Sequence, residues 1–499
     1  MKMVKVLPIV IFALLPGSTT RAQGVNNTEL KGDYAFTFSG MTTGGSGAST
    51  PFTAVGRFTA DGAGNLTNGE LDANGFGLAF GLGEKAVAQP FTGTYSIGAD
   101  HRGVMNLKVP GGGTLAFAMM ANGNAKFVEV DASGGRGTVG SGSMEKVDPT
   151  AFNTARITGD YVFGAAGLDP SNNRTAMAGR FTANGSGMLS NGAADVNQSG
   201  TFTTLNTFVG TYMVTDTTTG RGVINLPPLA GGALQNLNFV FYVVNAGKFF
   251  AMETDAVSPL TPALNGMVLQ QQTPVGGFSS TELNGNTVMY LTGRAICPGG
   301  ANARPNVIAG LLSTDGAGIS NLTYDQNCGG SSSVTGLSGT YSVAANGRTA
   351  FQLGGAYMAA YLVSPNQAFF IVPDSSVLFG FGDAQEAGPF TNSAITGRYA
   401  GSVTATAALG VTIFSGEFTG DGASPTGNLT GTEDIGAPSG ASLGVTANAT
   451  FSISSLPTNG RGTIAGNIAG SGVMYVVSPS KFVVLSLSDA NPAVLIFEQ

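Results

Sequence analysis

The sequence predicts an all-β fold of four tandem antiparallel β-meander domains, each an eight-stranded up-and-down barrel. Three observations support this class. The 499 residues include 31 Phe, 12 Tyr and no Trp, and aromatic and β-branched residues favour pleated strands. Gly is abundant, with 77 residues, and recurs at turn signals between short runs. No long stretch has the three-and-four apolar spacing of an amphipathic helix.

Four similar openings divide the chain into repeats. They read LKGDYAF from Leu30, ITGDYVF from Ile157, LNGNTVM from Leu283 and ITGRYAG from Ile395. The stretches between repeats are polar and contain Pro, as linkers do, so we expect a string of domains, each with its own core. The predicted domains are residues 28–148, 156–272, 281–388 and 394–499.

Turn signals cut the first repeat into eight runs of the length expected for strands. A meander of eight strands can close into a small barrel and so remove its exposed edges. The alternative is an eight-bladed β-propeller, because Phe58–Asp72 aligns without gaps to Phe117–Asp131 and each half-repeat would suit one blade. The eight runs are Asp33–Gly40, Thr53–Ala60, Asn65–Ala73, Phe91–Ala99, Gly103–Val109, Thr114–Ala121, Ala125–Ala132 and Thr138–Lys146.

The N-terminus has the form of a secretory signal peptide, with basic MKMVK, apolar VLPIVIFALL and polar PGSTTRA in succession. We predict residues 1–22 as the signal, cleaved after Ala22. The apolar run is much shorter than the roughly twenty residues that span a bilayer, so no membrane span is expected after cleavage. The protein is predicted to be secreted, periplasmic or on the cell surface. A formal net charge of −7 without basic clusters argues against nucleic acid as a partner.

The phrases GRFTADGAGNLTNGELD and GRFTANGSGMLSNGAAD stand at the same place in the first and second repeats. We interpret their centres as hairpin turns, in which Asp61 or Asn184 bonds its own backbone and Gly takes a positive φ. A calcium loop is the alternative, because Asp61, Asn65 and Asn68 carry side-chain oxygens. The second repeat has Asn184 in place of Asp61, and the EF-hand spacing is absent, so the turn is favoured.

An Asp closes both the third and the seventh predicted strand of every repeat. Two carboxylates on one rim could bind a metal or act as an acid and base pair. In a closed barrel the third and seventh strands lie opposite each other, so we expect instead that each Asp caps a turn in solvent. The four pairs are Asp72 and Asp131, Asp195 and Asp255, Asp325 and Asp374, and Asp434 and Asp489.

Residues for nucleophilic, metal-dependent or nucleotide chemistry are few. His101 is the only histidine, and it occupies a turn where the other repeats have Gly before an Arg. A Ser-His-Asp site is therefore not expected, and two cysteines are too few for a thiolate cluster. No glycine-rich phosphate loop opens a helix. We predict no catalytic residue, no metal and no cofactor, and hence no enzymatic activity.

The GRFTADGxGN and GTYxVxxxGRG phrases resemble those of uncharacterised secreted repeat proteins of soil bacteria, over nearly all of the chain after the signal peptide. The opening Leu-x-Gly-x-Tyr is similar to the first strand of lipocalin-like and avidin-like barrels, in which a Trp usually stands in place of the Tyr. The second resemblance implies a barrel, and the first implies no known activity.

Loops after the first strand differ between repeats, whereas turns at the other end recur, a division typical of a scaffold that presents variable loops. The predicted function is that of a secreted, non-enzymatic protein for surface interaction, adhesion or extracellular scaffolding, with an unknown extracellular ligand or surface as its partner. One alternative is an extracellular ligand-binding or carbohydrate-active protein, and a third is an outer-membrane barrel. The loops read MTTGGSGASTP, GLDPSNNRTA and AICPGGANARPN.

Both cysteines lie in the third repeat. Cys297 follows its first predicted strand and Cys328 its third, so in an up-and-down meander both emerge at the same rim. An exported protein meets an oxidising compartment. We predict a Cys297–Cys328 disulfide that joins two loops and contributes about 2–4 kcal/mol.

Overall fold

The computed structural model describes residues 25–43, 49–75, 85–110, 112–132, 137–227, 237–297, 302–404 and 413–499. The predicted signal peptide, residues 1–22, lies outside the described residues, as do parts of the first and third variable loops. Among the described residues no helix is long and apolar enough to cross a membrane. Short 3-10 turns precede the first strand of each repeat, namely η1 (Asn27–Glu29), η2 (Pro149–Ala151), η3 (Thr154–Arg156), η4 (Ser280–Glu282) and η5 (Asn392–Ala394).

Every repeat folds as a closed eight-stranded antiparallel barrel. The first contains β1 (Lys31–Thr43), β2 (Ser49–Asp61), β3 (Asn65–Gly75), β4 (Lys85–Ile97), β5 (Arg102–Lys108), β6 (Thr114–Met119), β7 (Ala125–Glu129) and β8 (Gly137–Lys146). The second contains β9 (Thr158–Leu168), β10 (Arg174–Asn184), β11 (Met188–Gln198), β12 (Thr201–Asp216), β13 (Arg221–Leu226), β14 (Leu237–Asn245), β15 (Lys248–Glu253) and β16 (Ala263–Gln270).

The third and fourth barrels repeat this order. The third contains β17 (Asn284–Ile296), β18 (Ala303–Asp315), β19 (Ile319–Asn327), β20 (Ser331–Val343), β21 (Arg348–Leu353), β22 (Ala356–Ser364), β23 (Gln367–Ile371) and β24 (Phe379–Ala384). The fourth contains β25 (Thr396–Val403), β26 (Ile413–Asp421), β27 (Gly427–Gly436), β28 (Ser442–Ile453), β29 (Arg461–Gly466), β30 (Gly470–Ser478), β31 (Lys481–Ser486) and β32 (Val494–Glu498).

Each barrel closes by pairing its first strand with its eighth. Tyr34 lies opposite Lys146 in β1 and β8, and Tyr161 lies opposite Gln270 in β9 and β16. The predicted fold class is confirmed, and each of the eight runs predicted in the first repeat contains a strand. The propeller alternative is wrong, because the two halves of a repeat share one closed barrel instead of forming separate blades.

Aromatic rings fill the barrel interiors because glycines on neighbouring strands make room for them. A Cβ at Gly103 would collide with the Phe117 ring, and one at Gly142 with the Phe127 ring. The spaces left inside the first and second barrels are about 10 and 30 Å³. Interiors of this kind are packed cores without room for a ligand.

The hairpins after the second strands have the predicted turn chemistry. Asp61 Oδ1 accepts the backbone N–H groups of Ala63 (2.7 Å) and Asn65 (3.0 Å). In the second barrel Asn184 Oδ1 does the same for the residues two and four positions later, at 2.8 and 3.0 Å. Gly62, at φ +78°, supplies the positive φ. The turn interpretation is confirmed for both repeats.

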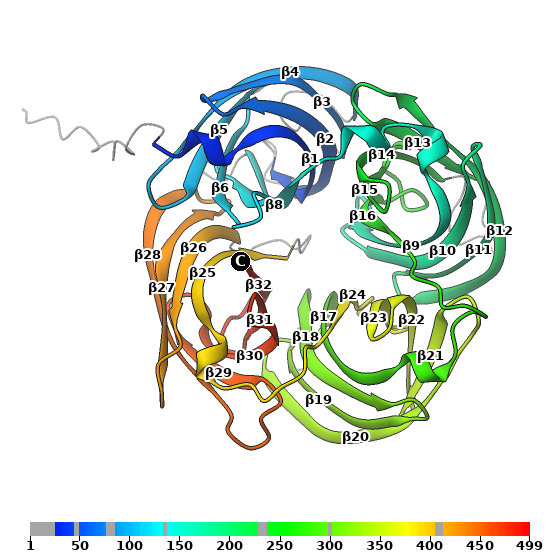
Figure 1. The fold of residues 1–499 in the computed structure, drawn as a ribbon, viewed down its shortest axis with the longest axis vertical. Coiled ribbons are helices and arrows are strands. Elements are labelled where there is room, and N and C mark those ends of the chain that lie inside the picture. Colours follow the sequence, from blue (N-terminus) through cyan, green and yellow to red (C-terminus); the bar gives the residue numbers. More distant parts are fainter. Residues whose placement is uncertain are drawn as a thin grey trace, which may run out of the picture.

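The four barrels form a closed ring (Figure 1). The second strand of each barrel packs on the sixth and seventh strands of the next: β2 contacts β14 and β15, β10 contacts β22 and β23, and β18 contacts β30 and β31. Strand β26 of the fourth barrel contacts β6 and β7 of the first and completes the circle. Each barrel has its own core, as predicted, but the barrels are packed in a ring instead of following one another as a string, because every barrel contacts two neighbours.

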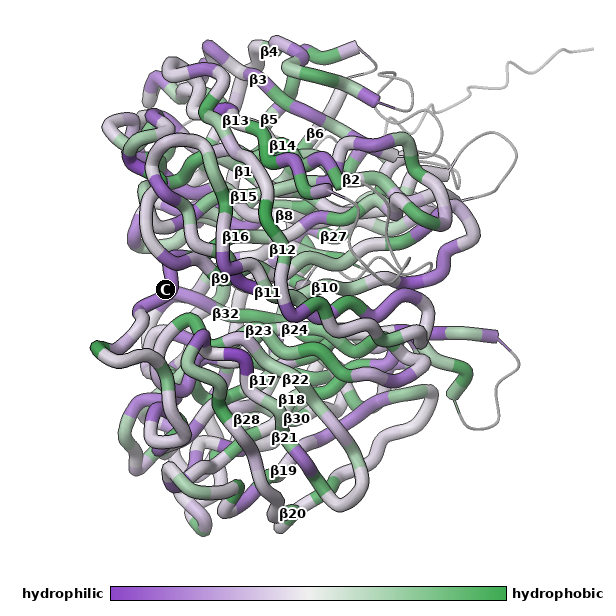
Figure 2. Tube along the Cα trace, turned by 90° about the vertical axis from the view of Figure 1, so that its right-hand side faces the viewer, coloured by the Kyte–Doolittle hydropathy of each residue, from purple (hydrophilic) through white to green (hydrophobic). Residues whose placement is uncertain are grey.

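Apolar clusters between the barrels explain why the ring forms. Strand β10 is buried at eight consecutive residues from Arg174 to Phe181, so its outward face is covered as well as its inward face. Figure 2 shows hydrophobic residues concentrated in the strands and hydrophilic residues in many of the loops at the two faces of the ring. The cluster between the first and second barrels consists of Ala35, Val55, Val240, Tyr242, Val244, Phe250 and Met252.

Candidate functional site: the axial cavity and the ion pairs between barrels

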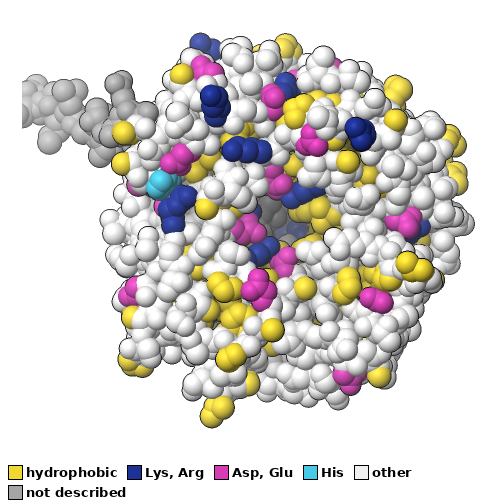
Figure 3. Space-filling view, viewed as in Figure 1, with side chains coloured by type: hydrophobic (Ala, Val, Ile, Leu, Met, Phe, Trp, Pro, Cys, Tyr) yellow, Lys and Arg dark blue, Asp and Glu magenta, His cyan; other side chains and the backbone are white. Residues whose placement is uncertain are grey.

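A cavity of about 720 Å³ lies where the four barrels meet. Most of its wall comes from the first and eighth strands of each barrel, the two strands that close it. Figure 3 shows a hollow at the centre of the ring, bordered by basic and acidic side chains. Because the interiors of the first and second barrels are filled, the space between the barrels offers more room for a ligand than either of these interiors. One layer of the wall has the equivalent residues Ser39, Ala166, Thr292 and Thr404.

Ion pairs across barrel boundaries line one part of this cavity. Lys126 of the first barrel lies 2.7 Å from Glu498 of the fourth, and Lys481 of the fourth lies 2.8 Å from Asp383 of the third. Lys481 also approaches Glu498 at 3.0 Å. Although burial opposes its ionisation, the two ammonium groups hold the pKa of Glu498 well below its usual range. Lys248 of the second barrel makes the corresponding contact with the first, by pairing with Glu145 at 2.7 Å.

A second set of charged groups joins the barrels away from the axis. The Arg that begins each fifth strand reaches the Asp of the third strand in the preceding barrel, with N–O distances of 2.8 or 2.9 Å. The four Asp side chains are buried. Because the fourth pair joins the fourth barrel to the first, the ion pairs follow the whole ring. The pairs are Arg221–Asp72, Arg348–Asp195, Arg461–Asp325 and Arg102–Asp434.

The prediction that these four Asp residues cap turns in solvent is wrong. Apolar strand faces from two barrels cover each carboxylate, and the Arg of the next barrel supplies its counter-charge. A Tyr adds a bond at three of the contacts: Tyr242 donates to Asp72 (2.9 Å), Tyr361 to Asp195 and Tyr475 to Asp325. Burial, followed by the charge of Asp72, raises the pKa of Tyr242 well above its usual value.

The turn-cap prediction holds for two of the four Asp residues at the seventh-strand positions, Asp374 and Asp489, each of which accepts the backbone N–H of the residue two positions later. Asp131 and Asp255 do not cap turns: each accepts the backbone N–H of a residue 17 positions earlier, Thr114 and Asn238, on the neighbouring strand. The two members of each predicted pair therefore serve different contacts. Among the described residues no group of three or more His, Cys, Asp or Glu side chains could hold a metal ion.

An Asn two positions after the third-strand Asp also crosses between barrels. Asn74 Nδ2 donates to the backbone oxygens of Glu253 (2.9 Å) and Asp255 (2.8 Å). Asn197 makes the same pair of bonds to Val372 and Asp374 of the third barrel. These bonds fix the position of one barrel relative to the next.

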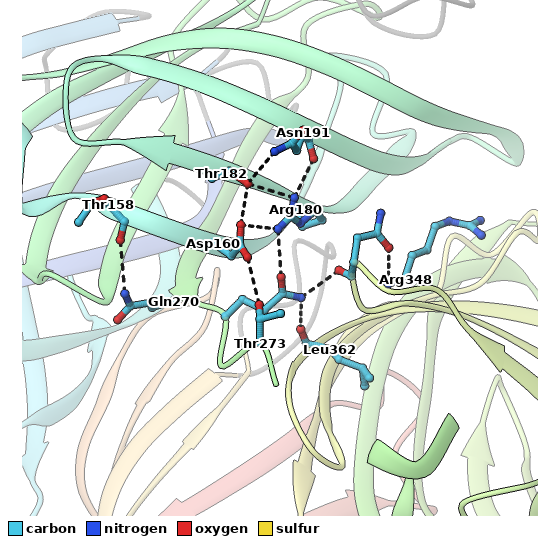
Figure 4. A network of polar contacts seen from close by, with 11 residues as sticks. Thr158, Asp160, Arg180, Thr182, Asn191, Gln270, Thr273, Arg348 and Leu362 are labelled. Carbon is cyan, nitrogen blue, oxygen red and sulfur yellow. Dashed lines mark hydrogen bonds and ion pairs between the residues drawn. The ribbon is translucent and has the colours of Figure 1, made fainter. Parts of the chain in front are cut away.

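Polar side chains join the second and third barrels at the linker (Figure 4). Asp160 accepts a hydrogen bond from Thr182 Oγ1 (2.6 Å) and pairs with Arg180 (2.5 Å). Although burial opposes it, these contacts lower the pKa of Asp160. Gln271, in the linker, donates to the Leu362 carbonyl of the third barrel at 2.6 Å. The linker is thus part of the contact between the two barrels.

The remaining predicted residues have clear places. His101 lies in its hairpin at φ +61°, with Nδ1 2.7 Å from Glu29 Oε1. The Cys297–Cys328 disulfide is confirmed, with Cα atoms 5.2 Å apart. The described variable loop of the second barrel is held by Asp169, whose Oδ1 accepts two backbone N–H groups.

Sequence reasoning missed the Arg partners of the buried Asp residues. The available signal was their recurrence: in a chain with 10% charged residues, an Arg opens every fifth strand and an Asp stands in every third. Two opposite charges that recur once per repeat suggest a contact that is repeated between units.

No family model and no curated protein sequence matches the chain. Among solved structures, one of a protein named AttH from Nitrosomonas europaea has 11% identity and a TM-score of 0.17, covering 53% of this chain and 99% of that one. Two mutants of the vaccine antigen transferrin binding protein B from Haemophilus parasuis have 10% and 11% identity and TM-scores of 0.17 and 0.18. Both alignments cover 77% of this chain and 85% of the other. TM-scores of this size carry no argument about function.

Proposed function

We propose that the protein is a secreted, non-enzymatic ring that acts by extracellular interaction, and that its axial cavity is the ligand site. The observation that carries the proposal is the contrast in free space. The cavity between the barrels measures about 720 Å³, against about 10 and 30 Å³ inside the first two barrels. Ligand pockets usually measure about 300–1,000 Å³.

The chemistry of the cavity favours binding over catalysis. Its three lysines are tied to carboxylates at 3.0 Å or less, so their protons and charges are committed to ion pairs. His101, the usual kind of proton carrier near neutral pH, is held in a hairpin by Glu29. The predicted signal peptide and the disulfide support an extracellular location.

The test is a binding screen with the cavity blocked by a side chain. Ser39→Phe places a ring in the axial wall, whereas Thr94→Phe places the same ring on the exposed outer face of β4. Purified protein is screened against small organic acids, amines, sugars and a glycan array by thermal shift and calorimetry. We expect hits that Ser39→Phe abolishes and Thr94→Phe preserves. Turnover of hydrolase substrates by the wild type, or hits that both variants preserve, would contradict the proposal.

A further inference from the structure

The lining of the axial cavity contains one basic side chain that no described carboxylate neutralises. Four basic and three acidic residues line the cavity. The three carboxylates are those of Glu145, Asp383 and Glu498, and each pairs with a lysine. Arg174 is the fourth basic group, and it is 6% exposed. A buried charge without a counter-charge is costly unless something compensates it.

The hydrogen bonds of Arg174 leave part of its guanidinium unused. Nε donates to the carbonyl of Val377 (3.2 Å), and Nη2 donates to the carbonyl and hydroxyl of Thr292 (3.2 and 3.0 Å). These acceptors are neutral and belong to the third barrel. Nη1 has no acceptor among the described residues, and Arg174 lies in the cavity wall. The two N–H groups of Nη1 therefore remain for a ligand.

A second arginine makes the unneutralised charge of Arg174 more costly. Arg294 of the third barrel donates to the carbonyls of Asn172 and Ala303, again without a described carboxylate. Burial, with the charge of Arg294 added, lowers the pKa of Arg174 to about 10. An anion at this place would be attracted by both guanidinium groups.

Arg174 departs from the repeat at a position where the fold does not need it. Counting back from the Gly that the second strands share, Gly56, Gly179 and Gly310, the equivalent residue is Pro51 in the first barrel and Pro305 in the third. The corresponding residue of the fourth barrel lies outside the described residues. Since two barrels close normally with a proline here, barrel folding does not account for the arginine.

The wall beside Arg174 is aromatic and hydroxylated. Thr292, which accepts from Arg174, pairs across the sheet with Phe379. The Phe379 ring is stacked on Phe369, which in turn meets Phe381 edge to face at 4.9 Å between ring centres. All three rings line the cavity. An apolar surface next to the guanidinium group of Arg174 suits a molecule with one acidic group and an apolar body.

We propose that the axial cavity binds an amphiphilic carboxylate, with its carboxylate on Arg174 and its apolar part against Phe379 and Phe381. This inference rests on the proposed function of the cavity. It adds the chemical class of the ligand and the residue that selects it.

The experiment measures binding of three probes of equal chain length by calorimetry: octanoate, octanol and octylammonium. The wild type is expected to bind octanoate about tenfold or more tightly than octanol, as one charge-assisted hydrogen bond from Nη1 allows, and not to bind octylammonium. Arg174→Met should abolish this preference and leave octanol affinity unchanged. Arg174→Lys, which keeps the charge, should retain part of the preference and make it sensitive to salt. Lys108→Met, an exposed charge change on β5, is the matched control.

The outcomes separate the two proposals. Equal octanoate affinity in the wild type and Arg174→Met, with both proteins folded by circular dichroism, would show that Arg174 only links the barrels. If octanoate fails to bind but another ligand binds in a manner abolished by Ser39→Phe, the function stands and the carboxylate inference is wrong. If no small molecule of any class binds in that manner, both are wrong.

Discussion

Three contacts in the ring join barrels that follow each other in the chain, and one joins the fourth barrel to the first. We call the first three the linked interfaces and the last the closing interface. All four have the Arg–Asp pair. The linked interfaces add a Tyr and an Asn, whereas the closing interface has Ala118 and Gly436 at the equivalent positions. The ion pair is thus the part of the contact that does not vary.

The closing interface uses side chain to backbone bonds in place of the missing Tyr and Asn. Ser415 Oγ donates to the carbonyl of Lys126 (2.8 Å), and Arg398 Nη1 donates to that of Met119 (2.9 Å). Gly436 is required there, because a Cβ would stand 2.6 Å from the backbone oxygen of Glu129. The backbones approach closely at this point, which an Asn would prevent.

A charge reversal also distinguishes the fourth barrel. The first and second strands are joined by Asp33 with Arg57 in the first barrel and by Asp160 with Arg180 in the second. The fourth barrel has Arg398 and Glu417 at these positions, 3.1 Å apart. The third barrel has the uncharged residues Asn286 and Leu311 at these positions. The comparison teaches that the pair is dispensable in one barrel and that, where it occurs, the sign at each position is free, as expected when attraction and not a specific chemistry is required.

The largest expected effect comes from removing a buried Asp at a linked interface. Asp325 accepts bonds from Arg461, Tyr475 and Ser333. Asp325→Ala leaves the Arg and Tyr without their acceptor, and we expect a loss of about 3–5 kcal/mol in the free energy of unfolding. The measurement is the urea midpoint. Asp374→Ala, which removes a turn cap from the same barrel, is the control and should cost about 1 kcal/mol. Equal losses would refute the distinction between the two Asp positions.

The same change at the closing interface should alter shape as well as stability. Asp434 is the partner of Arg102, and no linker joins the fourth barrel to the first. Asp434→Ala should weaken the contact by about 3 kcal/mol and increase the population of open rings. Small-angle X-ray scattering should report a larger radius of gyration with unchanged circular dichroism. A closed ring in Asp434→Ala would mean that the apolar contacts alone suffice.

Charge reversal offers a rescue experiment. Glu417→Arg places two guanidinium groups together at the closing interface and should cost about 2 kcal/mol, because like charges repel at a partly buried site. Arg398→Asp in the same molecule restores the arrangement of the first two barrels and should recover most of the loss. A double mutant as unstable as Glu417→Arg would show that the sign of the pair is fixed by other neighbours.

The pH dependence of stability compares the closing interface with a linked interface through two buried carboxyl groups at equivalent positions. Glu129 ends β7 of the first barrel, and Glu253 ends β15 of the second. Burial, with the charge of Asp131 added, raises the pKa of Glu129 from 4.5 to about 9, and burial raises that of Glu253 to about 9. Between pH 4.5 and about pH 9 each carboxyl group is protonated in the folded state and ionised in the unfolded state. Each group's stabilisation is therefore complete below pH 4.5 and declines toward pH 9, by up to about 1.4 kcal/mol per pH unit.

Glutamine variants test this slope. Asn74 donates to Glu253 Oε2 at 3.2 Å, whereas Glu129 Oε2 has no hydrogen-bond partner in the described part of the chain. Glu129→Gln should therefore flatten the pH profile more than Glu253→Gln. The measurement is the urea midpoint at pH 5, 7 and 9. A midpoint that rises with pH in the wild type would show that these carboxyls are ionised in the folded protein.

The smallest expected effect is the loss of one hydroxyl at a linked interface. Tyr361→Phe removes the 3.1 Å bond to Asp195 but keeps the ring and the Arg348 pair. We expect a loss of about 1 kcal/mol, read from the thermal midpoint. Met120→Leu at the closing interface, which has no such hydroxyl, is a volume-conserving control. A loss of stability as large as that of Asp325→Ala would show that the Tyr hydroxyl contributes as much to the contact as the buried Asp.

Local features of the fold could be predicted from the sequence because their causes are local. The hairpin turns follow from Asp61 and its neighbouring Gly residues, and strand order then brings Cys297 and Cys328 to one rim. The barrel follows from eight strands that must remove their edges.

The ring and its ion pairs could not be predicted, because their partners are far apart and alike. Arg221 lies 149 residues from Asp72, and the same Asp recurs in every repeat, so periodicity shows that a contact exists without showing which copies meet. Arg174 escaped notice for the opposite reason. An Arg occurs at this position in only one of the three barrels compared, and the difference becomes visible only when Arg174 is aligned with Pro51 and Pro305.

Ring closure has a consequence for the evolution of the gene. In an open solenoid, recombination can add or delete a unit, because each unit requires only its neighbours. Here the last barrel must present Asp434 to Arg102 of the first, and each contact turns the chain by a fixed fraction of the circle (Figure 1). Gain or loss of a single unit would leave the apolar outer faces of two barrels uncovered. Copy number is therefore constrained by geometry, whereas residues within a unit can differ, as Arg174 differs from Pro51 and Pro305.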